Sequence, residues 1–105
     1  MTNQISLQEA ETLTHAFQNS IEFQGQTIAG EINKAEIVNL INQTDCINIR
    51  IYNAINSNNQ LTFVIVGVNA AGEDMTGGII LDRLALCPPN CHNSSPLMLT
   101  NGENY

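Results

Sequence analysis

The feature that most constrains this chain is the segment Leu61–Val68 (LTFVIVGV), which is apolar on both faces of an extended strand. A strand of this kind is typical of the centre of a sheet that is covered on both sides. The preceding segment, Ile47–Tyr52, alternates isoleucine with Asn, Arg and Tyr, which predicts a strand with one buried face. Asn56–Asn59 between them is rich in asparagine and predicts a turn. The two segments therefore predict the central hairpin of the fold.

Two helices are predicted before this hairpin. Ser6 and Glu9 have the spacing of a capping box, and apolar residues then recur at helical spacing, so we expect a helix over about Leu7–Gln18. Asn33 has the character of a second N-cap, with a carboxylate in the following turn to meet the helix dipole. The expected buried residues of the two helices are Leu7, Ala10, Leu13 and Phe17, and Ile37, Val38, Leu40 and Ile41.

Two further strands complete the expected fold. Thr27–Ile32 predicts a short edge strand, and Ile79–Leu86 predicts a last strand. The order α-β-α-β-β-β indicates an α+β fold, with two helices packed on one face of a mainly antiparallel three- to four-stranded sheet. We expect residues 1–91 to form a single domain and residues 92–105 to form a tail that is flexible or ordered by contact. The second face of the central strand needs this tail or a second copy of the chain.

The net charge argues against two classes of partner. The 105 residues carry a net charge of −7 with three Lys and Arg in total, so neither nucleic acid nor an anionic membrane surface is an expected partner. No window has the length and apolarity of a membrane span, and the first residues lack the pattern of a secretion signal. These observations predict a cytoplasmic protein.

The segment Cys87-Pro88-Pro89-Asn90-Cys91-His92 carries the candidate chemistry. Cys87 and Cys91, together with Cys46 and His92, would supply three thiolates and an imidazole, which is a known ligand set for zinc. Copper would accept Cys87, Cys91 and a histidine as soft ligands. Against a metal, the two prolines stiffen the loop and remove two backbone donors.

Two other interpretations of the cysteines stay open. Cys87 and Cys91 could form a dithiol–disulfide couple, but no helix follows to lower a thiol pKa. Alternatively the segment is a structural end to the last strand, with Cys46 buried and the cysteines either reduced or joined as a disulfide, for which Cys87 with Cys91 is one pairing. The residue pattern favours this structural interpretation and implies no cofactor.

Arg50 and Tyr52 are the candidate interaction surface. They share the polar face of the strand Ile47–Tyr52, and both residue types are enriched at protein interfaces. Arg50 is also expected to pair with a carboxylate across the sheet. The sequence contains no recognisable constellation of nucleophile, base and orienting group, which disfavours an enzyme.

Three segments of the chain form a recognisable set: Asp45–Tyr52, Val64–Ala70 with Gly72 and Asp74, and Cys87–Cys91. They contain a central C-x-x-x-R-I-Y strand, a V-G-x-x-x-x-G strand and turn, and a terminal C-P-P-x-C. In these three features the chain resembles a group of small uncharacterised bacterial proteins. The resemblance covers roughly residues 31–91 and supports the layout, but it implies no activity; this chain continues past the last cysteine.

The function favoured by these observations is that of a small non-catalytic domain that binds another protein or associates with itself as a homodimer. The alternative is a thiol-based redox or metal-binding protein that uses the CPPNC segment, with zinc or copper as the metal.

Overall fold

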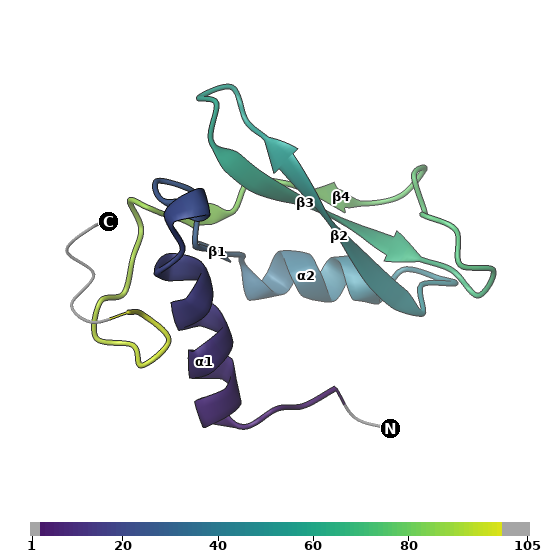
Figure 1. The fold of residues 1–105 in the computed structure, drawn as a ribbon. Coiled ribbons are helices and arrows are strands. Elements are labelled where there is room, and N and C mark those ends of the chain that lie inside the picture. Colours follow the sequence, from purple (N-terminus) through teal and green to yellow (C-terminus); the bar gives the residue numbers. More distant parts are fainter. Residues whose placement is uncertain (1–2, 100–105) are drawn as a thin grey trace. The chain divides into compact units, whose positions relative to one another are not determined.

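The structure is a computed structural model in which residues 3–99 are described. It has the expected α+β class, with two α-helices and antiparallel strand pairing (Figure 1). In chain order the elements are α1 (Leu7–Gln18), a 3-10 helix (Ile21–Phe23), β1 (Ala29–Glu31), α2 (Lys34–Ile41), β2 (Asn48–Ile55), β3 (Leu61–Val68), β4 (Ile80–Leu81) and β5 (Ala85–Cys87). No α-helix among the described residues has the length and apolarity required to cross a membrane.

The chain forms two compact units. One unit comprises the chain up to Ala29 together with the chain from Cys87, and the other comprises Gly30–Leu86. The short strands β1 and β5 pair with each other, and each contains a point where the chain passes from one unit to the other. The expectation of a single domain over residues 1–91 stays a prediction.

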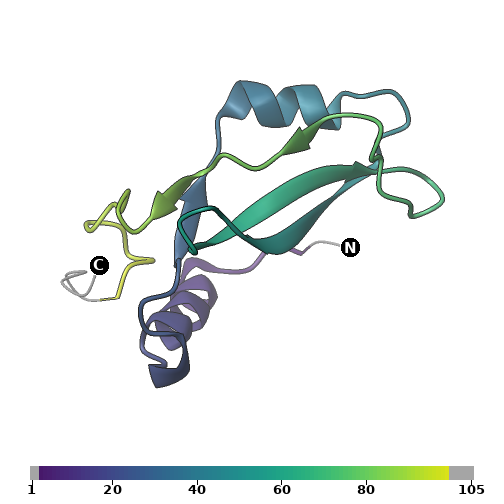
Figure 2. The same cartoon turned by 90° about the horizontal axis from the view of Figure 1, so that it is seen from above.

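The unit Gly30–Leu86 contains a three-stranded sheet in the order β2-β3-β4, so the predicted central position of Leu61–Val68 is confirmed. The β2–β3 register is unbroken from Asn48 opposite Val68 to Ile55 opposite Leu61. Helix α2 lies along one face of this sheet (Figures 1 and 2). Leu40 of α2 is fully buried, and the fully or nearly buried apolar side chains of β3 are Ile65, Val66 and Val68.

Local hydrogen bonds explain where the elements begin and turn. The Ser6 and Glu9 side chains form the predicted capping box of α1, and the Asn33 Oδ1 atom accepts from the backbone N–H of Ala35 at 2.8 Å. In the β2–β3 turn, the Asn56 Oδ1 atom accepts from two backbone N–H groups, and Asn59 adopts a φ of 60° that asparagine tolerates. Each of these features could be predicted because it depends on residues adjacent in sequence.

The predicted last strand is not continuous. Ile79–Leu86 contains β4 and the start of β5, separated by a turn in which Leu84 N donates to Asp82 O at 2.9 Å. The exposed Arg83 side chain lies 4.0 Å from the Asp82 carboxylate. The break divides the expected strand between two sheets, because β4 pairs with β3 whereas β5 pairs with β1.

Candidate functional site

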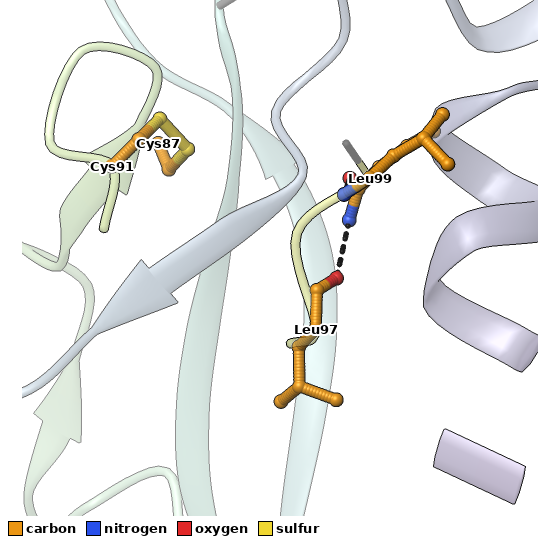
Figure 3. The surroundings of a disulfide bond; sticks show 5 residues. Cys87, Cys91, Leu97 and Leu99 are labelled. Carbon is orange, nitrogen blue, oxygen red and sulfur yellow. Dashed lines mark hydrogen bonds between the residues drawn. A yellow bond between two sulfur atoms is a disulfide. The ribbon is translucent and has the colours of Figure 1, made fainter. Parts of the chain in front are cut away.

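Cys87 and Cys91 are joined by a disulfide at the end of β5 (Figure 3). Their Cα atoms are 4.8 Å apart, and the two intervening X-Pro peptide bonds, Cys87-Pro88 and Pro88-Pro89, are cis. Cys87 is buried, and its carbonyl accepts from Ile28 N at 2.8 Å. The disulfide therefore closes a small loop on a strand end that is already anchored by its backbone.

Cys46 and His92, the other candidate metal ligands, each have a hydrogen-bond partner of their own. Cys46 is a free thiol in the unit Gly30–Leu86, where its Sγ atom lies 3.4 Å from Asn48 O. His92 interacts instead with the Ser94 hydroxyl at 2.9 Å. Within residues 3–99, no group of three His, Cys, Asp or Glu side chains is arranged to hold a metal ion. While Cys87 and Cys91 are bonded to each other, neither can supply the thiolate that zinc requires.

The segment after the disulfide docks on α1 as far as Leu99. The Gln18 side chain holds two backbone groups of this segment: its Nε2 donates to Leu97 O at 3.1 Å, and its Oε1 accepts from Leu99 N at 2.7 Å. Figure 3 shows Leu97 and Leu99 on this part of the chain. Thr14 also donates to Leu97 O, at 3.0 Å, and Met98 is buried. The predicted tail thus contacts α1 at Leu97 and Leu99. The expectation that it is flexible or ordered by contact stays a prediction, and residues 100–105 lie outside the described residues.

The prediction of which α1 residues are buried is wrong for two leucines. Leu7 and Leu13 were expected in its buried stripe, yet they are 58% and 64% exposed. The residue of α1 that is buried is Gln18, which faces the tail backbone. A helical period identifies residues on one face, but it does not establish that this face is the one that packs.

Arg50 and Tyr52 both bind the carboxylate of Asp74, which the sequence analysis did not name as their partner. Arg50 Nη1 lies 2.5 Å from Asp74 Oδ1, and the Tyr52 hydroxyl donates to Asp74 Oδ2. Asp74 reaches this position because it forms an isolated antiparallel bridge with Val68, the residue opposite Asn48 in the register. Both oxygens of Asp74 are therefore occupied by side chains of β2.

The three groups shift one another's titration. The hydrogen bond from Tyr52, and secondarily that from Arg50, lowers the pKa of the Asp74 carboxyl. The hydrogen bond to Asp74 raises the pKa of the Tyr52 phenol and also raises the pKa of the Arg50 guanidinium. All three groups are thereby held in the charge states they have at neutral pH, so the cluster is an electrically paired feature and not an unbalanced charge.

The opposite face of β2 is apolar and exposed. Ile49, Ile51 and Ile55 are 43%, 59% and 70% exposed, and Ile47 just before the strand is 59% exposed. The prediction that this strand has one buried face is therefore wrong, although its alternation is real. β2 is the edge of the sheet, and burial ends at β3.

A groove runs beside the exposed isoleucines. It has a volume of about 370 Å³ and is lined by Ile41 at the end of α2 and by Cys46, Ile47, Asn48 and Ile49. Ile41 is 45% exposed, although the sequence predicted it to be buried. Since Ile41 and Ile49 line the same groove, the exposed isoleucine row lies on the α2 side of the sheet.

The outer backbone of β2 is available for pairing. Asn56 N donates to Gln60 O at the hairpin end, which marks a hydrogen-bonded pair next to the turn. Bonded and non-bonded pairs alternate in an antiparallel ladder, so Ile49, Ile51 and Asn53 direct their N–H and C=O groups away from β3. Within residues 3–99, no strand pairs with that outer side.

No protein-family model, curated protein or solved structure matches this chain. The resemblance to small bacterial proteins therefore stays a prediction, and the site is interpreted from its own geometry. We define the β2 edge as the outer backbone of Asn48–Ile55 with the exposed isoleucines of that strand and the adjoining groove.

Sequence reasoning identified Arg50 and Tyr52 but missed the apolar half of the β2 edge. It also named neither Asp74 as the shared partner nor Ile55 as a surface residue. The strand extends beyond Tyr52 to Ile55, although Asn53 and Ala54 interrupt the alternation before that residue. Extending the predicted strand to the asparagine turn would have included Ile55. The exposure of Ile55 could not be predicted without knowing the order of the strands in the sheet.

Proposed function

We propose that this chain is a small non-catalytic domain that binds a protein strand along the β2 edge. The observation that carries the proposal is the row of isoleucines on an edge strand, of which Ile51 is 59% exposed and Ile55 is 70% exposed. Isolated exposed apolar residues are common on protein surfaces and need no explanation. A row of them beside unpaired strand backbone is a template for pairing with another chain.

The β2 edge lacks the devices that usually prevent such pairing. Natural edge strands are protected by lysine, proline, bulges or short length. β2 runs from Asn48 to Ile55 without lysine or proline, and its register with β3 is continuous. Its one charged residue, Arg50, is paired with Asp74. These features support an edge that is used for binding.

Strand addition fits the chemistry of this edge. In this binding mode the backbone hydrogen bonds supply affinity, and the alternate side chains supply specificity. On the β2 edge the outward N–H and C=O groups would bind the incoming backbone, while Ile49 and Ile51 would contact its apolar side chains. The net charge of −7 supports a protein partner in preference to nucleic acid.

The test is photo-crosslinking of the full chain in cells of its source organism. A photoreactive phenylalanine analogue at Asn53 should form an adduct whose crosslinked site maps to a strand-forming segment of the partner. Ile51→Lys should abolish the adduct, because a lysine on the edge opposes strand addition. Leu13→Lys is the matched control, because Leu13 is a similarly exposed leucine on α1. In that variant the photoreactive residue at position 53 should form the adduct in unchanged yield. An adduct that is absent, or equally strong with Ile51→Lys, would refute the proposal.

The disulfide favours a second candidate function, a thiol-based redox protein that uses Cys87 and Cys91. We propose the cytoplasm as the location, where disulfides are usually kept reduced. The burial of Cys87 supports a structural clasp, because a buried sulfur is poorly accessible to exchange. A reduction potential below about −300 mV would fit the clasp, and one near −230 to −180 mV would fit a redox couple. Native mass spectrometry of the reduced protein with zinc would test the metal-binding alternative.

A further inference from the structure

We infer that the strand bound by the β2 edge is β2 of a second copy, paired antiparallel about a two-fold axis at Ile51. This inference rests on the proposed function and names its partner. A two-fold interface uses the same surface on both copies, so the strand must be complementary to itself.

The charge of the β2 edge fits a strand like β2. The edge presents one charged side chain, Arg50, and the Asp74 carboxylate neutralises it. It therefore offers no unpaired charge to a strongly basic or acidic segment. An incoming strand that matches it carries alternating apolar residues and little net charge, and NIRIYNAI itself has this composition.

The axis at Ile51 gives a register without opposed like charges. In this register Ile51 faces Ile51 of the second copy, and Ile49 faces Asn53. Arg50 faces Tyr52, which places a guanidinium beside an aromatic ring instead of beside another guanidinium. An axis one residue earlier would oppose Arg50 to itself, and like charges directly opposite each other destabilise a strand pair.

The same register also places an apolar side chain beside the groove. Ile55 is the most exposed isoleucine of β2, at 70%, and it would lie opposite Ile47 of the other copy. Ile47 lines the groove with Ile41 and Ile49. Each copy would thus place its Ile55 beside the groove of the other, and the outward N–H and C=O groups of Ile49, Ile51 and Asn53 would be paired. Because the axis is perpendicular to the sheet, one continuous sheet would run through both copies.

A charge-swap experiment on the purified full chain tests the axis directly. Ile51→Lys and Ile51→Glu should each weaken self-association by at least about 100-fold, because the axis places the like charges of the two copies side by side. An equimolar mixture of the two variants should recover a dimer, since lysine then faces glutamate. Sedimentation velocity measures all three samples, and Leu13→Lys should sediment like the unmodified chain. Circular dichroism verifies that the variants are folded.

Cysteine pairs then test the register on a Cys46→Ala background. Asn48→Cys mixed with Ala54→Cys should form a crosslinked dimer on mild oxidation, because residues 48 and 54 are opposite each other at a non-hydrogen-bonded pair. Asn48→Cys alone, or mixed with Asn56→Cys, should crosslink weakly. A stronger crosslink in the mixture with position 56 would overturn the register.

The two proposals fail in distinguishable ways. A purified chain that stays monomeric at millimolar concentration, with crosslinks in cells only to a different protein, would overturn the second copy as partner and leave the binding function in place. A chain that is monomeric and also forms no adduct in cells would overturn both.

Discussion

Gly67 provides the sharpest test of the packing between α2 and the sheet. It is a buried residue of the central strand β3, opposite Ile49. A Cβ atom at this position would lie 2.9 Å from Cys46 Sγ, and 3.3 Å from both Gln43 Nε2 and Met75 Sδ. Three side chains from outside the strand thus converge on the space that the absent side chain leaves.

We expect Gly67→Ala to lower the free energy of unfolding by about 1–2 kcal/mol. Forcing one extra carbon into a well-packed site costs about 1–3 kcal/mol. Replacing glycine also reduces the entropy of the unfolded chain, which returns about 0.4–1 kcal/mol. The crowding outweighs the entropy gain because the closest atom belongs to the short side chain of Cys46, which has little freedom to withdraw.

Urea unfolding followed by circular dichroism measures this change, with Gly77→Ala as the matched control. A Cβ atom at Gly77 meets no atom within 4 Å, so that variant should be neutral or slightly stabilised. On a Cys46→Ala background the cost of Gly67→Ala should fall by about 0.5–1 kcal/mol, since contacting residues couple. Equal stability of Gly67→Ala and Gly77→Ala would refute the close approach at Gly67.

Three further substitutions test other contacts. Gln43→Ala should destabilise the fold by about 1–3 kcal/mol in the same urea assay, because it leaves Ile79 N without the acceptor that lies 2.8 Å away. Gln18→Leu should release the tail backbone from α1, and limited proteolysis should then cleave the chain near Leu97 faster than in the unmodified protein. Asp74→Asn should flatten the acid limb of stability against pH: the folded carboxyl has the lower pKa, so its contribution is present above the unfolded pKa of about 4 and is lost as pH falls through the folded pKa. A stability curve that is unchanged below pH 4 would contradict the pairing of Asp74.

The two helices and the β2–β3 hairpin could be predicted because their causes are local in sequence. The capping box of Ser6 and Glu9, the cap at Asn33 and the asparagine turn at Asn56 each act within a few residues. The central position of β3 also followed from its own composition, since a strand without a polar face must be covered on both sides.

The exposure of the β2 edge could not be predicted in the same way. Alternation in Ile47–Tyr52 states which side chains share a face, but not what covers that face. Coverage depends on strand order, and β2 is an edge strand. The contacts of Asp74 join residues 22 to 24 positions apart in sequence, and those of Gln18 join residues 79 to 81 positions apart. No local sequence pattern predicts contacts over such separations.

The cysteines show a third limit of sequence reasoning. The spacing of Cys87 and Cys91 permits a metal site, a redox couple or a disulfide, because each needs two sulfurs within a few ångströms. The choice among them depends on further ligands and on the environment of the sulfurs. In the structure Cys87 and Cys91 are bonded to each other and Cys46 is a free thiol, and the bond between the two sulfurs fits both a structural disulfide and the oxidised form of a redox couple.

Salt dependence separates a second copy from a charged partner on physical grounds. Two copies of this chain repel each other because each carries a net charge of −7, while the β2 edge is locally neutral and joins through backbone hydrogen bonds and apolar contacts. Added salt screens the repulsion over about 10 Å at 0.1 M and leaves the contacts of the edge nearly unchanged. Self-association measured by sedimentation should therefore strengthen between about 0.02 and 0.5 M NaCl, over a range in which the Debye length shrinks several-fold. Binding to a basic protein or peptide would weaken over the same range. If the self-association measured by sedimentation weakens with added salt, β2 of a second copy is excluded as the main partner of this edge.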